Sequence, residues 1–409
     1  MKDIIQKSCG LDVHQAIIVS CIQRQGYQKQ IRTYGTTTQE LDLLKRWLKE
    51  EDITHIAMES TGIFWKPVYN ILKDEQWELL LVNARHMKNV PGRKTDVQDC
   101  EWICKLLRAG LLRGSFIPPK DIQQLRSLTR HQKTLQHQIQ NEKNRVHKLL
   151  QQCNIKITQV LSDVFGVAGM SILTDLSNGI TCPDRLVKHM EKNKRLASKK
   201  VQAVACLKGK ISSKDQVMLN IMLQTIAFYG DQIIRLEREV NELIEPYRLE
   251  HELLQTIPGI KKKAANHIIA ELSANMDHFP SEKHLSSWAG LCPGNNESAG
   301  KKKSSRLKHG NNHLRAILTE CAWAVIKTNN TYFRAKFYKL SPRMGRKQAL
   351  AAIAHKIIIN CYHILKYKVL FKELGSDYFT KGKEEKLVQH YKKKLMNLGY
   401  NISIESVNN

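Results

Sequence analysis

Two acidic residues three positions apart, Asp96 and Asp99, constrain the fold of this chain more than any other feature. They lie in the stretch 94–99 (KTDVQD), directly before an amphipathic run that is typical of a helix. Positions i and i+3 of a helix share one face, so the two carboxylates lie close together and repel each other. Either a bound cation offsets that repulsion, or one acid caps the helix and the other interacts favourably with the helix dipole.

Two earlier acids belong to the same pattern. Asp12 lies in GLDVH (10–14) and opens the apolar run 16–19, while Glu59 follows the apolar run 53–58. Each acid alone is typical of a turn or a cap, but four acids in the order strand, strand, helix predict a site for a hard cation. Mg²⁺, with Mn²⁺ as the alternative, binds oxygen ligands, and two such ions can hold the attacking and leaving oxygens of a phosphodiester.

The first hundred residues predict an α/β layer. An apolar, β-branched stretch at 9–22 favours a buried strand, with a hairpin partner at 27–34. Alternating helical and extended patterns follow, and we predict helices at 38–50, 65–74 and 96–109 and strands at 53–58 and 78–82. A strand pair followed by alternating helices and strands is the order of an α/β fold.

The chain carries a formal net charge of +27, which favours a polyanionic partner, and nucleic acid is the first expectation. We expect no membrane contact, because no apolar run approaches the roughly 20 residues that span a bilayer. The ten cysteines are scattered without a Cys-x-x-Cys pair, so we predict reduced, packed thiols in a cytoplasmic protein. The polar start of the chain predicts no signal peptide.

Two heptad seams mark the middle of the chain. Positions 125–149 carry apolar residues at six of eight seam positions, and positions 219–243 carry them at all eight. Two such helices can pair with each other within one chain, or they can also pair across the subunits of a dimer or tetramer. The heptad pattern alone does not distinguish these two arrangements.

Residues 253–272 predict a helix, a turn at Pro258 and Gly259, and a second helix. This is the pattern of a helix-hairpin-helix motif or of a simple helix hairpin. In the first case, the turn amides and the N-terminus of the second helix bind a backbone phosphate. Three lysines directly after the turn add positive charge: Lys261, Lys262 and Lys263.

A glycine-rich stretch at 289–300 contains Ser298 and leads into a basic segment. From Ser298 to Arg315 there is no acidic residue, and there are six basic ones: Lys301, Lys302, Lys303, Arg306, Lys308 and Arg315. A serine hydroxyl beside so much positive charge can attack phosphorus when a base or a metal activates it. The alternative is a flexible loop that binds phosphate without chemistry. Ser304 and Ser305 are the other candidate nucleophiles.

These motifs resemble those of a known family. GLDVH, MESTG (58–62) and KTDVQD, followed by GLCP, ESAGK and HGNNHLR between positions 290 and 315, are similar to motifs of the Asp-Glu-Asp-Asp (DEDD) transposases of bacterial insertion sequences. This is the insertion-sequence 110 family, with its 1111 subgroup. Where this chain has ESAG, many members carry SSGG, so the choice among Ser298, Ser304 and Ser305 stays open.

The resemblance implies a transposase that cuts and rejoins the DNA of its own element, on a ribonuclease-H-like (RuvC-like) α/β fold. It implies that Asp12, Glu59, Asp96 and Asp99 bind Mg²⁺, and that Ser298 is the nucleophile of a composite site, as in a serine recombinase. It also implies double-stranded DNA as a partner and a structured guide RNA that selects the target by base pairing. The implied protein is a homo-oligomer in the bacterial cytoplasm, associated with the nucleoid.

We therefore divide the chain into a RuvC-like domain at 1–117, an α-helical coiled-coil region at 118–250, a mostly α transposase domain at 251–372 and a basic tail at 373–409. The expected nucleic-acid contacts are basic side chains: Arg93, Lys94, Lys261, Lys262, Lys263, Lys301, Lys302, Lys303, Arg306, Lys308 and Arg315. One alternative is a Holliday-junction nuclease of the same fold, in which Ser298 is structural. The other is a non-catalytic, architectural DNA-binding protein, in which the acids cap and pack.

Overall fold

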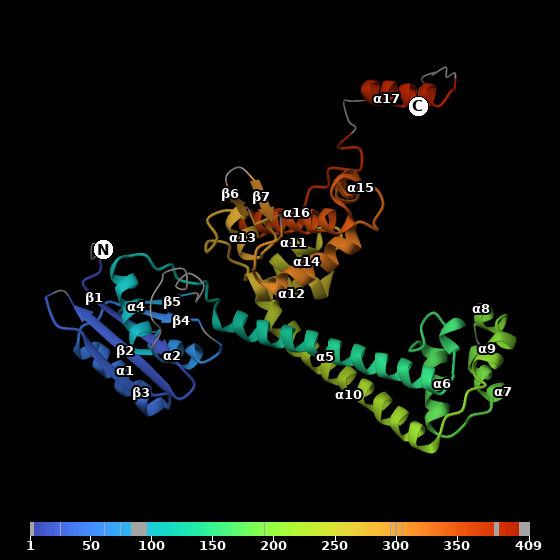
Figure 1. Cartoon of the computed structure of the whole chain (residues 1–409), viewed down its shortest axis with the longest axis horizontal. Coiled ribbons are helices and arrows are strands. Elements are labelled where there is room, and N and C mark those ends of the chain that lie inside the picture. The colour runs from blue at the N-terminus through green and yellow to red at the C-terminus, as the bar shows by residue number, and fades with distance from the viewer. Residues whose placement is uncertain are drawn as a thin grey trace. The chain divides into compact units, whose positions relative to one another are not determined.

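The computed structural model describes residues 4–24, 26–60, 62–73, 75–82, 96–191, 193–294, 296–298, 301–304, 306–379 and 384–400. For residues 96–98, 296–298, 301–304 and 384–387 it describes the backbone alone. The chain divides between Pro118 and Pro119 into two compact units. The first unit is coloured blue to cyan in Figure 1, and the second runs on to red.

The first unit is built on a five-stranded mixed sheet with the strand order β3-β2-β1-β4-β5. The strands are β1 (Lys7–Val13), β2 (Ile17–Arg24), β3 (Gln30–Gly35), β4 (His55–Glu59) and β5 (Glu78–Val82). β1, β2 and β3 form an antiparallel meander, whereas β4 pairs parallel to β1 and β5 pairs parallel to β4. Parallel neighbours bring their carboxyl ends to the same edge of the sheet.

The prediction of one strand at 9–22 is wrong, because this stretch forms a β-hairpin. β1 ends at Val13, β2 begins at Ile17, and the backbone N–H of His14 donates to the carbonyl of Ile17 at 2.9 Å. Apolar residues flank the turn on both sides, so the sequence pattern conceals it. Asp12 consequently lies near the end of β1 and does not open an apolar strand.

Helices cover both faces of the sheet, as predicted for an α/β layer. α1 (Thr38–Glu50) and α2 (Trp65–Leu72) pack on one face, where Leu44 belongs to a core shared with β1. α4 (Asp96–Arg108) packs on the opposite face, where Ile103 meets residues of β4 and β5. Figure 1 shows α1 and α4 on the two sides of the sheet.

The predicted strand at 27–34 is present as β3 but begins three residues later, and the remaining predicted elements of this unit are confirmed to within two residues. α1 begins at the predicted position because the hydroxyl of Thr37 accepts a hydrogen bond from the backbone N–H of Glu40. The predicted helices and strands correspond to α1, α2, α4, β4 and β5.

The cysteines of the described chain are free thiols, and Cys182 is the exposed one among them. Cys21, Cys100 and Cys104 lie together between β2 and α4. Hydrogen bonding to Cys100 is the main cause that raises the pKa of Cys21 to about 12. Cys21 is therefore neutral, and the three side chains pack α4 against the sheet, in agreement with the prediction of reduced, packed cysteines.

A long helical hairpin dominates the first part of the second unit. α5 (Lys120–Gln152) and α10 (Ser213–Ile244) lie side by side along much of their length (Figure 1). Val146 of the first heptad seam and Leu219 of the second share one buried cluster. The two predicted seams therefore meet within one chain, and an additional contact between subunits stays a prediction.

Short helices between α5 and α10 add their own core. They are α6 (Val167–Ser177), α7 (Pro183–Leu186), α8 (Lys194–Ala197) and α9 (Lys200–Cys206), with 3₁₀ turns at Ile157–Gln159 and Val187–Met190. Their apolar residues pack against the end of α5 and the start of α10. This core fixes the far end of the helical hairpin.

The stretch Ser213–Gln255 is long and apolar enough to cross a membrane by length and composition. The expectation from sequence that no apolar run approaches this length is therefore too strong. One such helix is a weak indication of a membrane span, although only 11% of its apolar window is buried in this structure. In this chain the helix packs along α5 through its heptad seam.

A helical bundle completes the second unit. After a 3₁₀ turn at Glu245–Tyr247 it contains α11 (Arg248–Gln255), α12 (Lys262–Leu272), α13 (Glu282–Trp288), α14 (Asn312–Val325), α15 (Tyr332–Met344) and α16 (Arg346–Tyr367), and a short hairpin of β6 (Asn296–Ser298) and β7 (Lys301–Ser304). The last helix of the described chain is α17 (Glu384–Asn397). The predicted helix, turn and helix are present as α11 and α12. Gly259 in the turn has a φ of +91°, and a Cβ there would lie 2.7 Å from the Cys321 carbonyl oxygen, so only glycine fits.

A buried carboxylate joins α5 to α12. Glu271 is 2% exposed, and the guanidinium of Arg130 donates to both of its carboxylate oxygens, at 2.7 and 2.8 Å. The amide of Asn311 donates to the same group at 2.6 Å, and Arg126 donates to the backbone carbonyls of Ala270 and Glu271. Burial acts to raise the pKa of Glu271, but Arg130, Asn311 and Arg126 together hold it below its ordinary value. Because Asn311 also caps α14, Glu271 links three helices.

We expect Glu271→Gln to lower the free energy of unfolding by on the order of 3 kcal/mol, because Arg130 and Arg126 then lack their buried counter-charge. A carboxyl group whose pKa is lower in the folded state stabilises the fold above its ordinary pKa, and that contribution is lost as the pH falls through the folded value. The wild type should lose stability below about pH 4.5, the ordinary value, and the variant should lose less. Urea unfolding at a series of pH values measures both.

Glu320→Gln is the matched control for this prediction. Glu320 pairs with Lys133 at 2.7 Å, but its side chain is 58% exposed. Exposed ion pairs contribute about 0–1 kcal/mol, so this variant should unfold nearly as the wild type does. An equal loss of stability in both variants would contradict a special role for the buried carboxylate.

Candidate active site

Asp12 and Glu59 lie at the carboxyl ends of two adjacent parallel strands. β1 pairs with β4 in a register that places Leu11 opposite Met58, so Asp12 and Glu59 follow as the next pair. Side chains at paired positions of parallel strands point to the same face of the sheet. Here that is the face of Ala57, which α4 covers. The sheet therefore brings these two predicted acids to one edge and one face.

Helix α4 runs antiparallel to β1 on that face. The thiol of Cys104 lies 3.3 Å from the hydroxyl of Ser8, near the start of β1. One helical turn earlier, the carbonyl oxygen of Cys100 would lie 2.3 Å from a Cβ at Gly10. From Ser8 to Gly10 the strand advances by two residues, and over the same distance the contacting helix residue changes from Cys104 to Cys100, one turn earlier in the sequence. The start of α4 lies toward the carboxyl end of β1.

The first turn of α4 carries the other two predicted acids, Asp96 and Asp99. Asp96 is the first residue of α4, one helical turn before Cys100. The side chain of Asp99 is half-buried. The side chain of Asp96 and the whole of Arg93 and Lys94 lie outside the described residues.

His14 is a contact of Asp12 that the sequence analysis did not single out. Its Nε2 atom lies 3.1 Å from Oδ2 of Asp12, in the turn between β1 and β2. Asp12 is 7% exposed, whereas the imidazole of His14 is about half exposed. The available signal was its place in GLDVH, two residues after the acid. The contact fixes the orientation of the Asp12 carboxylate.

The residue types at this edge are those that bind a hard divalent cation, because carboxylate oxygens are the ligands that Mg²⁺ prefers. Among the side chains that the structure describes, which include Asp12, Glu59 and Asp99, no three or more His, Cys, Asp or Glu residues are grouped closely enough to bind a metal. The side chain of the fourth predicted ligand, Asp96, is not described.

Ser298 lies at the end of a short hairpin in the second unit. β6 and β7 pair antiparallel, with Ser298 opposite Lys301 and Asn296 opposite Ser304. Ser298 therefore ends its strand beside the turn, whereas Ser304 lies at the other end of the hairpin. Ser305 lies outside the described residues, and for the hairpin strands the structure describes the backbone alone.

Backbone pairing fixes the base of this hairpin. The N–H of Gly294 donates to the carbonyl of Arg306 at 2.8 Å, and the N–H of Lys308 donates to the carbonyl of Cys292 at 3.1 Å. Gly310 lies so close to Gly290 that a Cβ at Gly310 would come within 2.2 Å of the Gly290 nitrogen. The two ends of the basic stretch are thus held together.

The predicted basic contacts have different surroundings. Arg306 and Lys308 are exposed, while Arg315 donates to the side chain of Asn312 at 2.7 Å. The side chains of Lys301, Lys302 and Lys303 lie outside the described set.

The three lysines around the start of α12 also differ. Lys261 caps α12 without a side-chain hydrogen bond, and Lys262 is exposed beside it. Lys263 forms an ion pair with Glu237 of α10.

Two family models match the chain. A model of DEDD transposases of the IS110 type matches residues 9–155, and a model of the transposase IS116/IS110/IS902 family matches residues 251–339. Together the two matches cover more than half of the chain. The chain belongs to the IS110 family of DEDD transposases. The first match contains all four predicted acids, and the second contains Ser298.

Curated relatives of this IS110 chain agree with the family. A pilin gene-inverting protein of Moraxella bovis is 33% identical over 148 residues, which are 34% of this chain and 45% of that protein. The pilin gene-inverting protein of Moraxella lacunata is 32% identical over the same length. A putative transposase, y4qE, of Sinorhizobium fredii is 20% identical over 83% of this chain and 73% of that protein. The chain thus spans less than half the length of the two pilin gene-inverting proteins.

Gly10 allows α4 to pack closely against β1 in this IS110 chain. A Cβ at Gly10 would lie 2.3 Å from the Cys100 carbonyl oxygen and 2.6 Å from the Cys104 backbone nitrogen. We expect Gly10→Ala to push α4 away from β1 and to lower the free energy of unfolding by about 1–3 kcal/mol. Thermal unfolding measures this change.

Gly230→Ala is the control variant, for which we expect the opposite change in the free energy of unfolding. Gly230 lies within α10, and a Cβ added there would meet no described atom within 4 Å. Alanine there should raise stability by up to ~1 kcal/mol, since glycine is unfavourable in a helix interior. If Gly10→Ala were as stable as the wild type, α4 would not be held against β1 by close backbone contact.

Proposed function

We propose that this protein is the transposase of a bacterial insertion sequence, which cuts and rejoins DNA by site-specific recombination. The observation that carries the proposal is the placement of Asp12 and Glu59 at adjacent carboxyl ends of parallel strands, beside the start of α4. The family supports it, as does the net charge of +27. The recombination reaction that gives the Moraxella relatives their name, the inversion of a pilin gene, is of the same chemical class.

In this proposal, Asp12, Glu59, Asp96 and Asp99 hold Mg²⁺, with Mn²⁺ as the alternative. Bound Mg²⁺ would polarise the scissile phosphate and stabilise the leaving oxygen. The protein's own contribution is to orient the carboxylates: His14 holds Asp12, and α4 presents its first turn to the strand ends. Strand order and the placement of the acids support a RuvC-like fold for this unit.

Ser298 is the proposed nucleophile. Its Oγ atom attacks phosphorus, a phosphoserine ester forms, and the bond from phosphorus to the leaving strand oxygen breaks. The serine gives up its proton and the leaving oxygen gains one, so the ester conserves the bond energy for rejoining. The position of Ser298 beside the turn of a basic hairpin supports this role over that of Ser304. Lys301, Lys302 and Arg306 neutralise phosphate charge.

The finer features of the proposal follow from the resemblance to the family. They are membership of the 1111 subgroup, a serine-recombinase-like composite site, a structured guide RNA, a homo-oligomer and a location at the bacterial nucleoid. α11 and α12 act in it as a helix-hairpin-helix that binds the DNA backbone through Lys261 and Lys262. α5 and α10 provide the coiled-coil region.

The test is strand cleavage by the purified protein. The protein is mixed with RNA transcribed from the flanks of its gene and a labelled DNA that carries the junction of the element, with Mg²⁺ or with a chelator. We expect a protein–DNA adduct that resists denaturation and appears only with the metal. Cleavage without an adduct would support a Holliday-junction type of nuclease. Binding without any cleavage would support an architectural protein.

A further inference from the structure

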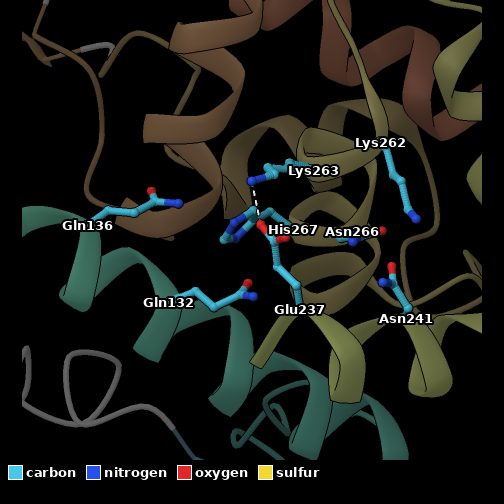
Figure 2. A pocket seen from close by; sticks show the side chains of 8 residues that line it. All are labelled: Gln132, Gln136, Glu237, Asn241, Lys262, Lys263, Asn266 and His267. Atoms are coloured by element: carbon cyan, nitrogen blue, oxygen red, sulfur yellow. Dashed lines mark ion pairs between the residues drawn. The ribbon is translucent and has the colours of Figure 1, made fainter. Parts of the chain in front are cut away.

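A polar pocket lies within the second unit where α5, α10 and α12 meet. Figure 2 shows its lining, in which four side-chain amides face the same space from three helices. The described residues that line it are Gln132, Gln136, Glu237, Asn241, Lys262, Lys263, Asn266 and His267. Among the described side chains, none of the proposed metal-binding acids is part of this lining. The concentration of amides distinguishes this pocket from a site that binds phosphate alone.

Asn266 carries a buried acceptor that no described group of the protein satisfies. It is 7% exposed, and its Oδ1 atom is buried without a hydrogen-bond partner in the described part of the chain. Leaving a buried polar atom unpaired costs about as much as a lost hydrogen bond. Gln132, on the opposite side of the pocket, is 6% exposed. Two nearly buried amides therefore line this one small space.

The chemistry of the amides selects the ligand. Oδ1 of Asn266 accepts hydrogen bonds, so its partner must carry an N–H or O–H group. A phosphodiester has only acceptor oxygens at neutral pH and cannot satisfy it. The edge of a nucleobase presents donors and acceptors side by side, and Asn or Gln amides pair with such edges in two hydrogen bonds. Asn266 and Gln132 are nearly buried between helices, so a base has to leave the stack of a duplex to reach them.

Positive charge at the same pocket can bind the phosphate group of a nucleotide. Lys262 lies at the first position of α12, whose N-terminal N–H groups have no side-chain cap from Lys261. A helix N-terminus and a lysine together attract a phosphate. Lys263 is paired with Glu237 across the pocket, which holds α12 against α10 (Figure 2).

We propose that this pocket binds one unpaired nucleotide of a single strand, with the base edge on the amides and the phosphate at Lys262. The inference rests on the proposed function in one respect, that the protein binds nucleic acid. It adds a direct contact to a base, which contacts to the backbone do not provide. The single strand is either RNA or unwound DNA, since both present the same edges.

The experiment measures binding of fluorescent 12-nucleotide single strands of about equal base composition. One arm uses DNA, one uses RNA, one uses the same DNA as a duplex, and one uses an abasic strand with the same backbone. We expect the full-length wild type to bind the normal single strand about tenfold more tightly than the abasic one. Asn266→Leu should lose this preference and should melt at the same or a higher temperature, because it removes an unpaired buried atom. Gln132→Leu is the second pocket variant.

The control and the outcomes separate this inference from the proposed function. Asn144→Leu, at an exposed position of α5 outside the pocket, should keep the preference for bases. If the wild type binds normal and abasic strands equally, or if both pocket variants keep the preference, the pocket does not bind a base. If neither duplex nor single strand binds, both the inference and the proposed function fail. Comparison of the RNA and DNA arms identifies the source of the strand.

Discussion

Ser298→Ala should abolish the denaturation-resistant protein–DNA adduct and lower recombination on the order of 10⁴-fold or more, the usual effect of removing a nucleophile. Alanine retains the strand backbone but has no Oγ atom to attack phosphorus. Because Ser298 ends β6 beside the turn, the pairing of the hairpin with Lys301 should persist. Recombination of a junction substrate and gel analysis of denatured protein–DNA mixtures measure the two effects.

Ser304→Ala is the matched control for that variant. Ser304 lies in the same hairpin, opposite Asn296 and away from the turn, so its replacement should keep the adduct. If instead Ser304→Ala or Ser305→Ala removes the adduct and Ser298→Ala keeps it, the nucleophile is misassigned. If Ser298→Ala still cuts DNA and no variant forms an adduct, the reaction uses water and the serine mechanism is wrong.

Local sequence signals are sufficient to predict most of the first unit. The threonines before α1 and the apolar periodicity after them predict its start, because an N-cap depends on neighbours three residues away. The turn between β1 and β2 is not predicted, since a hairpin of two apolar strands differs from one long strand by only a few residues around His14. The four candidate acids can be identified from the sequence because their positions at strand ends and at a helix start are local properties.

Contacts between distant segments cannot be predicted from the sequence pattern. Glu271 pairs with Arg130 across 141 residues, and no periodicity connects the two. The heptads identify the apolar seams of α5 and α10 but not their partners, because the same seam fits a helix of the same chain or of another. Gly10 is visible within its motif, yet its function in the close approach of α4 depends on the packed structure. The unpaired amide of Asn266 is likewise a property of the pocket.

Asp12→Asn should lower strand cleavage on the order of 10³-fold or more while the protein stays folded. Asparagine has nearly the same shape and can still contact His14, which lies 3.1 Å from the carboxylate. It lacks the negative charge that binds a divalent cation beside Glu59. Calorimetric titration with Mg²⁺ or Mn²⁺ should therefore show weaker binding, together with unchanged thermal unfolding.

The control for charge alone is Asp42→Asn on the exposed side of α1, which should cleave as the wild type does. Asp96→Asn should reproduce the loss seen with Asp12→Asn, because both acids hold the cation in the proposed site. Full cleavage by both variants would mean that these acids only cap and pack, and the architectural alternative would then hold. If Asp12→Asn loses strand cleavage but still binds the metal as tightly as the wild type, the cation binds elsewhere. Asp12 would then act by positioning His14.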